Sequence, residues 1–240
     1  MEIIKDDDIH LKFLLGLPVH IEGIGNFYAP SLTDIVDMTE EIYNMSISSL
    51  FFDKNQLENS QIELNKYSNF YILVSKLIAD PMYRMLFFNG LSLHLDTKPQ
   101  FHSEGIVYFG KLSEDSVLTE EKFEYIKKLV RIANNLAEPE KYDAANEKAK
   151  KLIEKIKKNR KNVKVPQKMN LHSIISSIGW RSQNFRFIRD LNIYQLYDGV
   201  GRLNAIDNYN YTMFGIYNGK IDGSKIKLPD INWANIIKNN

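Results

Sequence analysis

The stretch VHIEGIGNFYAPSLTDIV, residues 19–36, contains both kinds of regular structure that we expect in this chain. Val19 and Ile21 alternate with polar neighbours, and the glycines that follow favour a turn, so two short strands are predicted. Ser31 then marks a helix start, because its hydroxyl can accept from the amides of the first turn. Asp34 stands where a carboxylate completes such a cap. The stretch predicts an α+β fold in which a small antiparallel sheet precedes a helix.

Further helices and a second hairpin are predicted after this stretch. Apolar residues recur at helical spacing from Ser31 to about Asp53, and again over residues 66–79. Residues 91–95 alternate, and residues 105–112 are rich in β-branched and aromatic side chains. Both patterns are typical of strands, so we expect a hairpin whose turn is the intervening DTKPQFHSE. The hairpin would complete a small sheet with the first strand pair.

Three segments are predicted along the chain. Thr119 caps a helix that closes an N-terminal α+β domain, residues 1–137. Residues 138–168 form a basic connecting helix, and residues 169–240 restart an apolar pattern as a small all-α domain. The helices expected in this last segment lie at residues 170–180, 192–206, 208–220 and 228–237. The fold class expected is therefore α+β and predominantly helical.

Composition restricts the class of protein. The chain has 240 residues, of which 44% are hydrophobic and 25% charged, as in ordinary folded domains. It has no cysteine, which excludes disulfides, a thiolate nucleophile and cysteine zinc sites. No stretch reaches the roughly 20 apolar residues of a membrane span. The start is acidic where a signal peptide is basic. We therefore expect a cytosolic protein with no membrane partner.

The charge is concentrated in one segment. Residues 148–168 hold ten Lys or Arg and one acid, and the rest of the chain has 21 basic and 29 acidic residues, a net charge of −8. A nucleic-acid arm is one interpretation, and it predicts binding that weakens steeply with salt. The other is a solvated helix that joins two domains, favoured because no aromatic residue interleaves the charge. The basic patch comprises Lys150, Lys151, Lys155, Lys157, Lys158, Arg160 and Lys161.

The sequence offers no catalytic motif. No serine lies in a nucleophile elbow, and no two histidines are at helical ligand spacing. His94 and His102 could meet across the predicted hairpin and bind a metal with Asp96 or Glu104. Metal sites need three or four converging ligands, so exposed histidines are the simpler interpretation. We expect no catalytic residue, no metal site and no cofactor.

Aromatic residues gather in the last third of the chain. Amphipathic aromatics are enriched at protein interfaces, and they also form the cores of small helical domains. The sequence alone does not separate these two roles. The candidate partner-binding residues are Tyr194, Tyr197, Tyr209, Tyr211, Phe214, Tyr217 and Trp233.

Most of the chain resembles accessory proteins encoded in the tail gene clusters of phages of Gram-positive bacteria. The resemblance begins with the strand pair and helix of IEGIGNFYAPSLTDIVDMTEEIYNMSISSLFF, residues 21–52. It continues in GIVYFGK and LTEEKFEYIKKLV, residues 105–111 and 118–130. It ends in MNLHSIISSIGWRSQN and LNIYQLYDGVGRLNAIDNYNYTMFGIYNG, residues 169–184 and 191–219, after a lysine-rich stretch.

This resemblance implies a phage tail assembly chaperone. Such a protein is non-enzymatic and works in the host cytoplasm, with some kin remaining in the virion. Its expected partners are the tape-measure or tail-tube proteins during tail building, and a second copy of itself through weak association. Two alternatives stay open. One is a structural tail or baseplate component, and the other is a nucleic-acid-binding phage protein that acts through the basic segment.

Overall fold

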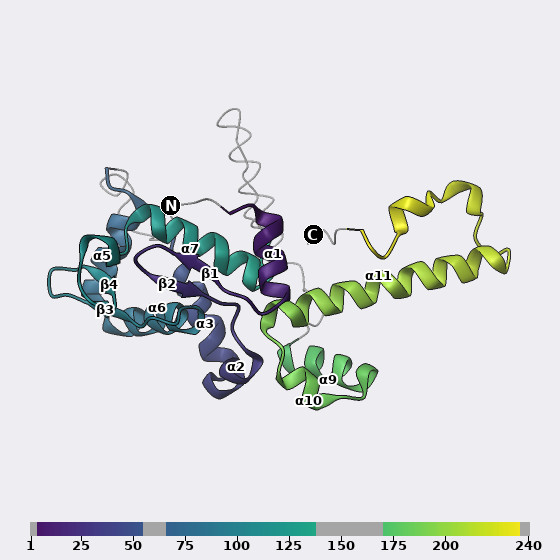
Figure 1. Cartoon of the computed structure of the whole chain (residues 1–240), viewed down its shortest axis with the longest axis horizontal. Helices are drawn as coiled ribbons and strands as arrows, with labels where there is room; N and C mark the ends of the chain where they lie inside the picture. Colours follow the sequence, from purple (N-terminus) through teal and green to yellow (C-terminus); the bar gives the residue numbers. More distant parts are fainter. Residues whose placement is uncertain (1–3, 55–65, 138–169, 236–240) are drawn as a thin grey trace, which may run out of the picture.

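The computed structural model describes residues 4–54, 66–137 and 170–235 (Figure 1). In these residues the chain is a mostly helical α+β protein, as the sequence predicts. The single small sheet expected from both strand pairs is instead two separate two-stranded antiparallel sheets. The helices are α1 (Asp6–Leu14), α2 (Leu32–Met38), α3 (Glu40–Leu50), α5 (Asn69–Ala79), α6 (Pro81–His94), α7 (Glu120–Ala133), α9 (Leu171–Ser182), α10 (Phe185–Arg189) and α11 (Ile193–Tyr217). The strands are β1 (Val19–Ile21), β2 (Gly25–Phe27), β3 (Pro99–Phe101) and β4 (Val107–Phe109).

The first sheet and the helix after it are confirmed. β1 pairs with β2 so that Val19 lies opposite Phe27. The Ser31 hydroxyl accepts from the Asp34 amide at 3.0 Å and so caps α2. The helix does not run on to residue 53, because Thr39 has a φ of 77°. Thr39 ends α2 and its side chain caps α3, so the predicted single helix is two.

The second hairpin uses a different first strand from the one predicted. Residues 91–94 are the last turn of α6, which begins at the Asp80–Pro81 pair because the Asp80 carboxylate accepts from the Tyr83 amide. The strand prediction for residues 91–95 is wrong. β3 instead comes from the segment expected to be the turn, and it pairs with β4. The two sheets stay separate, and a single bridge joins Phe27 to Leu95.

Other elements differ in extent from the predictions. α1 was not predicted, although its three aspartates lie in the first turn, where the helix dipole favours acids. α7 and α9 start at their predicted caps, Thr119 and Asn170. The two helices expected at 192–206 and 208–220 are one continuous helix, α11. In place of a helix at 228–237, the described residues hold a 3-10 turn, η4 (Leu228–Ile231), which follows a similar turn, η3 (Gly223–Lys225).

A single apolar core joins early and late parts of the chain. Phe27, Phe87 and Phe123 are fully buried in it, and α3 and α5 pack on either side of α6. Ile193 and Leu196, from the start of α11, are buried in the same cluster. In Figure 1, α11 leaves this body at the end of α1, and its far half extends beyond it.

A buried polar network ties the core together at His94. The imidazole donates from Nδ1 to the Gly90 carbonyl at 2.8 Å, and its Nε2 accepts from the Asn134 amide at 3.1 Å. Tyr43 donates its hydroxyl to the oxygen of the same Asn134 side chain. The ring stacks on Phe27 with 4.9 Å between ring centroids. Burial lowers the pKa of His94 to about 4, so the neutral ring is the folded form.

The neutral His94 makes stability depend on pH. The pKa of His94 in the folded chain, about 4, lies below its ordinary value of 6.5. Between these two pH values His94 is protonated in the unfolded chain and neutral in the folded chain. This contribution to stability is complete above about pH 6.5 and is lost as the pH falls towards 4. The unfolding free energy of the wild type falls between neutral and acid pH. We expect this fall to be smaller by about 2 to 3 kcal/mol in His94→Gln, measured by urea denaturation.

The control for this prediction is His102→Gln, because His102 lies on an exposed turn outside the core. It should retain the acid loss of the wild type. An unchanged acid loss in His94→Gln would contradict the buried neutral ring.

Two glycines make a second, matched test of the packing. A Cβ atom at Gly90 would lie 2.7 Å from the Ser46 carbonyl oxygen of α3, so α3 and α6 approach too closely for any side chain. Gly90→Ala should destabilise the chain by about 1 to 3 kcal/mol. At Gly199 in α11 a Cβ meets nothing within 4 Å, and alanine is the better helix former. Gly199→Ala should therefore stabilise by about 0.5 to 1 kcal/mol. Equal effects in thermal or urea denaturation would contradict the observed packing.

Candidate functional site

The start of α11 is anchored to the N-terminal body by backbone and side-chain hydrogen bonds. The Ile193 amide donates to the Pro30 carbonyl at 2.9 Å, and the Leu32 amide donates to the Leu191 carbonyl at 3.0 Å. The Asn192 side chain donates to the Phe13 carbonyl at 2.9 Å. We call residues 191–196, which make these contacts, the root of α11. The root fixes where the rest of the helix points.

The root also explains the first two candidate tyrosines. The Tyr194 hydroxyl lies 3.0 Å from His10 Nδ1, and its ring packs against Phe13. Burial raises the pKa of Tyr194 to about 12, and burial also raises the pKa of Tyr197. Both rings pack against the core cluster. Both tyrosines are therefore partly buried in the packing of the root.

The remaining aromatics of α11 lie on the part that extends from the body. Tyr211, Phe214 and Tyr217 are 75%, 67% and 80% exposed. Their spacing of three residues places them within one side of the helix, about 60° apart from one to the next. We call these three side chains the distal aromatic face. Exposed rings in one row are the feature of this chain most typical of a binding surface.

The last described residues lie beside another side of α11. A Cβ atom at Gly215 would meet Ile221 at 2.5 Å, so the chain after the helix folds back closely on this side. Arg202 donates to the backbone carbonyl of Trp233 at 2.6 Å. Trp233 is half exposed, and Tyr209 is half buried on α11. Neither ring belongs to the distal aromatic face, although the sequence grouped all of them together.

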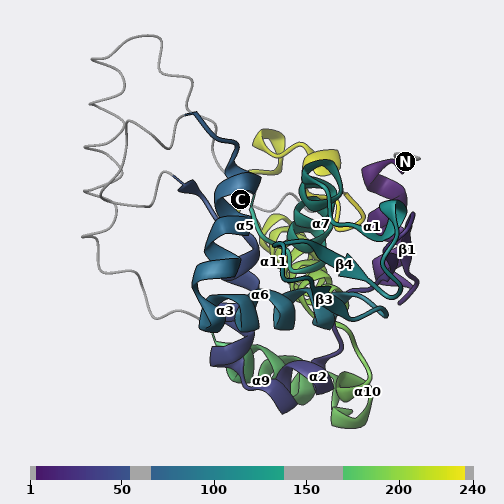
Figure 2. The same ribbon diagram turned by 90° about the vertical axis from the view of Figure 1, so that its left-hand side faces the viewer.

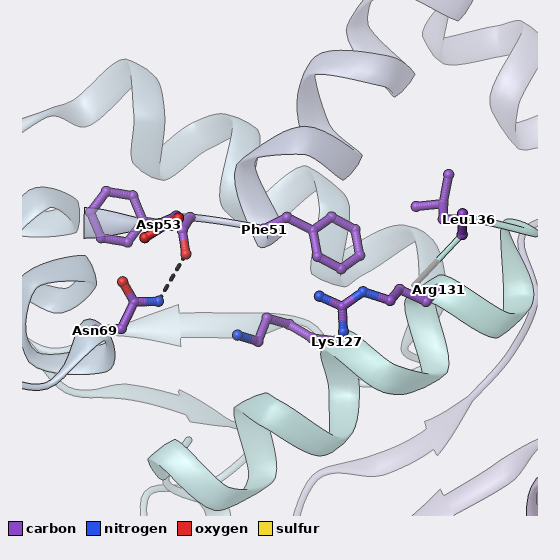
Figure 3. Close-up of a pocket in the computed structure, with 8 residues that line it drawn as sticks. Phe51, Asp53, Asn69, Lys127, Arg131 and Leu136 are labelled. Carbon is purple, nitrogen blue, oxygen red and sulfur yellow. Dashed lines mark hydrogen bonds between the residues drawn. The ribbon is translucent and has the colours of Figure 1, made fainter. Parts of the chain in front are cut away.

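A cavity lies between α7 and the end of α3 (Figure 3). It has a volume of about 490 Å³. The ammonium of Lys127 pairs with Glu124 at 2.5 Å, and the guanidinium of Arg131 lies 4.8 Å from the centre of the Phe51 ring. The Asn69 amide donates to the Phe52 carbonyl at 2.8 Å. Lys127 and Arg131 of α7 supply the positive charge of the lining, and Asp53 supplies a carboxylate.

A smaller apolar pocket is lined by residues of α2, α9 and α10. These three helices lie next to one another in Figure 2. Its volume is about 250 Å³, and Val36 and Phe185 line it while remaining largely exposed. Trp180 packs edge-on against Phe185 with 5.5 Å between ring centroids. Sequence reasoning missed this pocket, because its two walls are about 150 residues apart in the chain.

The histidine pair does not form a metal site in the described part of the chain. His94 is buried in α6, and His102 lies in the β3–β4 turn beside Glu104, so the two do not face each other across a hairpin. Among the described residues, no three histidine, aspartate or glutamate side chains converge. The basic patch, Lys150 to Lys161, lies outside the described residues.

Comparison with known families concerns the C-terminal part. Residues 157–238 match the family model of the YomV second domain. YomV is a Bacillus phage-type protein. This part of the chain is therefore similar to a domain of a phage-type protein. It spans about a third of the chain and includes α9, α10, α11 and the distal aromatic face.

No curated protein and no solved structure matches the chain. Among the helices of residues 4–54, 66–137 and 170–235, none is long and apolar enough to cross a membrane.

The root of α11 can be tested through Asn192. Its side chain holds the Phe13 carbonyl and also accepts from the Gln195 amide at 2.8 Å as the cap of α11. Asn192→Ala leaves both groups unpaired and should lower the unfolding free energy by about 2 kcal/mol, measured by urea denaturation. The control is Asn204→Ala, an exposed asparagine of the same helix, which should change stability by less than about 0.5 kcal/mol. Equal effects would contradict the anchoring role.

Proposed function

We propose that this chain is a phage tail assembly factor that binds tape-measure or tail-tube proteins through the distal aromatic face. The observation that carries the proposal is the row of exposed rings on α11, at Tyr211, Phe214 and Tyr217. The match to the YomV second domain supports a phage setting and includes this part of the chain. The likeness to tail accessory proteins, stated from the sequence, supplies the choice of partner.

The arrangement and the lack of charge of the distal aromatic face suit a helical partner. Three rings on one side of a helix offer ridges and grooves into which the apolar stripe of another helix can pack. Tyrosine adds a hydroxyl that stays hydrated at the rim, so an exposed row of this kind remains compatible with water before a partner arrives. Residues 208–218 carry no charged side chain, so the face should prefer an apolar stripe to an acidic or basic one.

The test is co-purification with the tape-measure and tail-tube proteins of the same phage. The wild-type chain should retain one of them, and the triple variant Tyr211→Ser, Phe214→Ser, Tyr217→Ser should weaken the affinity at least about tenfold, because buried aromatics dominate interface energies. The matched control is the double variant Tyr67→Ser, Tyr71→Ser. It removes a stacked, exposed pair of tyrosine rings, of which Tyr71 belongs to α5 and Tyr67 lies just before it. This control should bind as the wild type does.

Two negative outcomes have different meanings. Failure of the wild type to bind any tail protein contradicts the proposed function. Binding that the triple variant keeps in full contradicts the choice of surface and leaves the tail role standing. Circular dichroism of each variant checks that the helix content is unchanged.

A further inference from the structure

The sequence around Phe214 has an internal symmetry. Counted in either direction from Phe214, a tyrosine stands at the third residue and an asparagine at the fourth, which gives Asn210, Tyr211, Tyr217 and Asn218. All five side chains are exposed. Residues three and four positions away lie on the same side of a helix as the central one. The exposed side of the helix therefore has the same order of residues in both directions.

This side of α11 is left open by its neighbours among the described residues. α9 packs beside the first half of α11, and its last turn ends where Arg181 pairs with Asp207 through two hydrogen bonds of 2.6 and 2.7 Å. Tyr211 follows one helical turn later. The returning chain lies against Gly215, which is on a different side from Phe214. The packing of α9 thus stops before the symmetric segment. In Figure 1, α9 lies beside the first part of α11, and the far end of α11 extends beyond it.

We propose that the distal aromatic face pairs with the same face of a second copy of this chain. The two helices run antiparallel about a two-fold axis at Phe214. Each Phe214 then contacts its counterpart, each Tyr211 lies opposite the other copy's Tyr217, and each Asn210 opposite Asn218. A two-fold interface requires that residue i meets residue j while j meets i, and the symmetric order of this face meets that requirement without any change.

Charge supports a second copy as the occupant. Residues 208–218 contain no Asp, Glu, Lys or Arg, so an identical helix approaches without like-charge repulsion. The nearest charge towards the body, Asp207, is already neutralised by Arg181 at 2.6 Å. The asparagines at either end can hydrogen-bond with each other, because an amide both donates and accepts.

The size of the face predicts a weak dimer. Three aromatic rings in each copy would bury on the order of 900 Å² in total, which is below the range of stable interfaces. We therefore expect a dissociation constant in the micromolar range, with monomer and dimer in exchange. The pairing does not depend on the proposed tail function. If that function holds, pairing and tail-protein binding exclude each other because both use Phe214.

The test exploits the absence of cysteine, which makes single-cysteine variants specific reporters. In the purified full chain, Phe214→Cys should form a disulfide-linked dimer on mild oxidation. Thr212→Cys, on the opposite side of the same helix, should form little. A mixture of Tyr211→Cys with Tyr217→Cys should cross-link better than either alone, which distinguishes antiparallel from parallel pairing.

Sedimentation provides the second measurement, without any tail protein. The wild type should shift from monomer towards dimer between about 10 and about 300 µM. Phe214→Asp alone and Phe214→Lys alone should stay monomeric, because each places like charges at the two-fold axis, and their equimolar mixture should dimerise again. A wild type that is monomeric throughout, or equal cross-linking at residues 212 and 214, would overturn the proposal. Failure to bind tail proteins would not.

Discussion

The structure depends on how the start of α11 is held against the N-terminal body. The Phe13 and Pro30 carbonyls receive hydrogen bonds from Asn192 and Ile193, and Leu32 donates to Leu191. Apart from the Asn192 side chain, each of these groups belongs to the backbone, and a buried backbone group without a partner costs free energy. Segments about 160 residues apart in the chain therefore provide hydrogen-bond partners for each other's backbone groups. The same contact buries the start of α11 in the common core.

This anchor gives the distal aromatic face its position. α11 has 25 residues, so it is about 37 Å long at 1.5 Å per residue. A helix held firmly at one end presents its other end at a fixed distance and rotation. Arg181 and Asp207 add a bidentate contact half-way along, from α9. Beyond that contact Phe214 is available to other molecules, and a helical partner or a second copy are the occupants that its surroundings favour.

Features encoded within a few residues could be predicted from sequence. The glycine turn before Phe27, the cap at Ser31 and the cap at Asn170 all depend on neighbouring residues, and the structure confirms them. The strand prediction at residues 91–95 failed because five residues can alternate by chance within a helix. There Leu91 and His94 both face the core, three residues apart. The break at Thr39 carries no signal, because the helical spacing continues across it.

The candidate site was predictable only in part. Periodicity identified the aromatic residues of α11, but it could not separate Tyr194, which packs at the root, from Tyr211, which is exposed. That distinction is tertiary, since it depends on where α1 and α9 stop. The missed helix α1 is the clearest case, because its Phe13 forms part of the anchor through a contact with Asn192, far along the chain.

Native-state hydrogen exchange tests the central claim most directly. If α11 is anchored as described, the amides of residues 196–203 exchange only through global unfolding, with the same free energy as those of α7 (Figure 1). The amides near Tyr217 should exchange more readily, because among the described residues that end packs only against the returning chain. Exchange of all of α11 together, at a lower free energy than α7, would show that the helix opens separately from the body and would contradict the account.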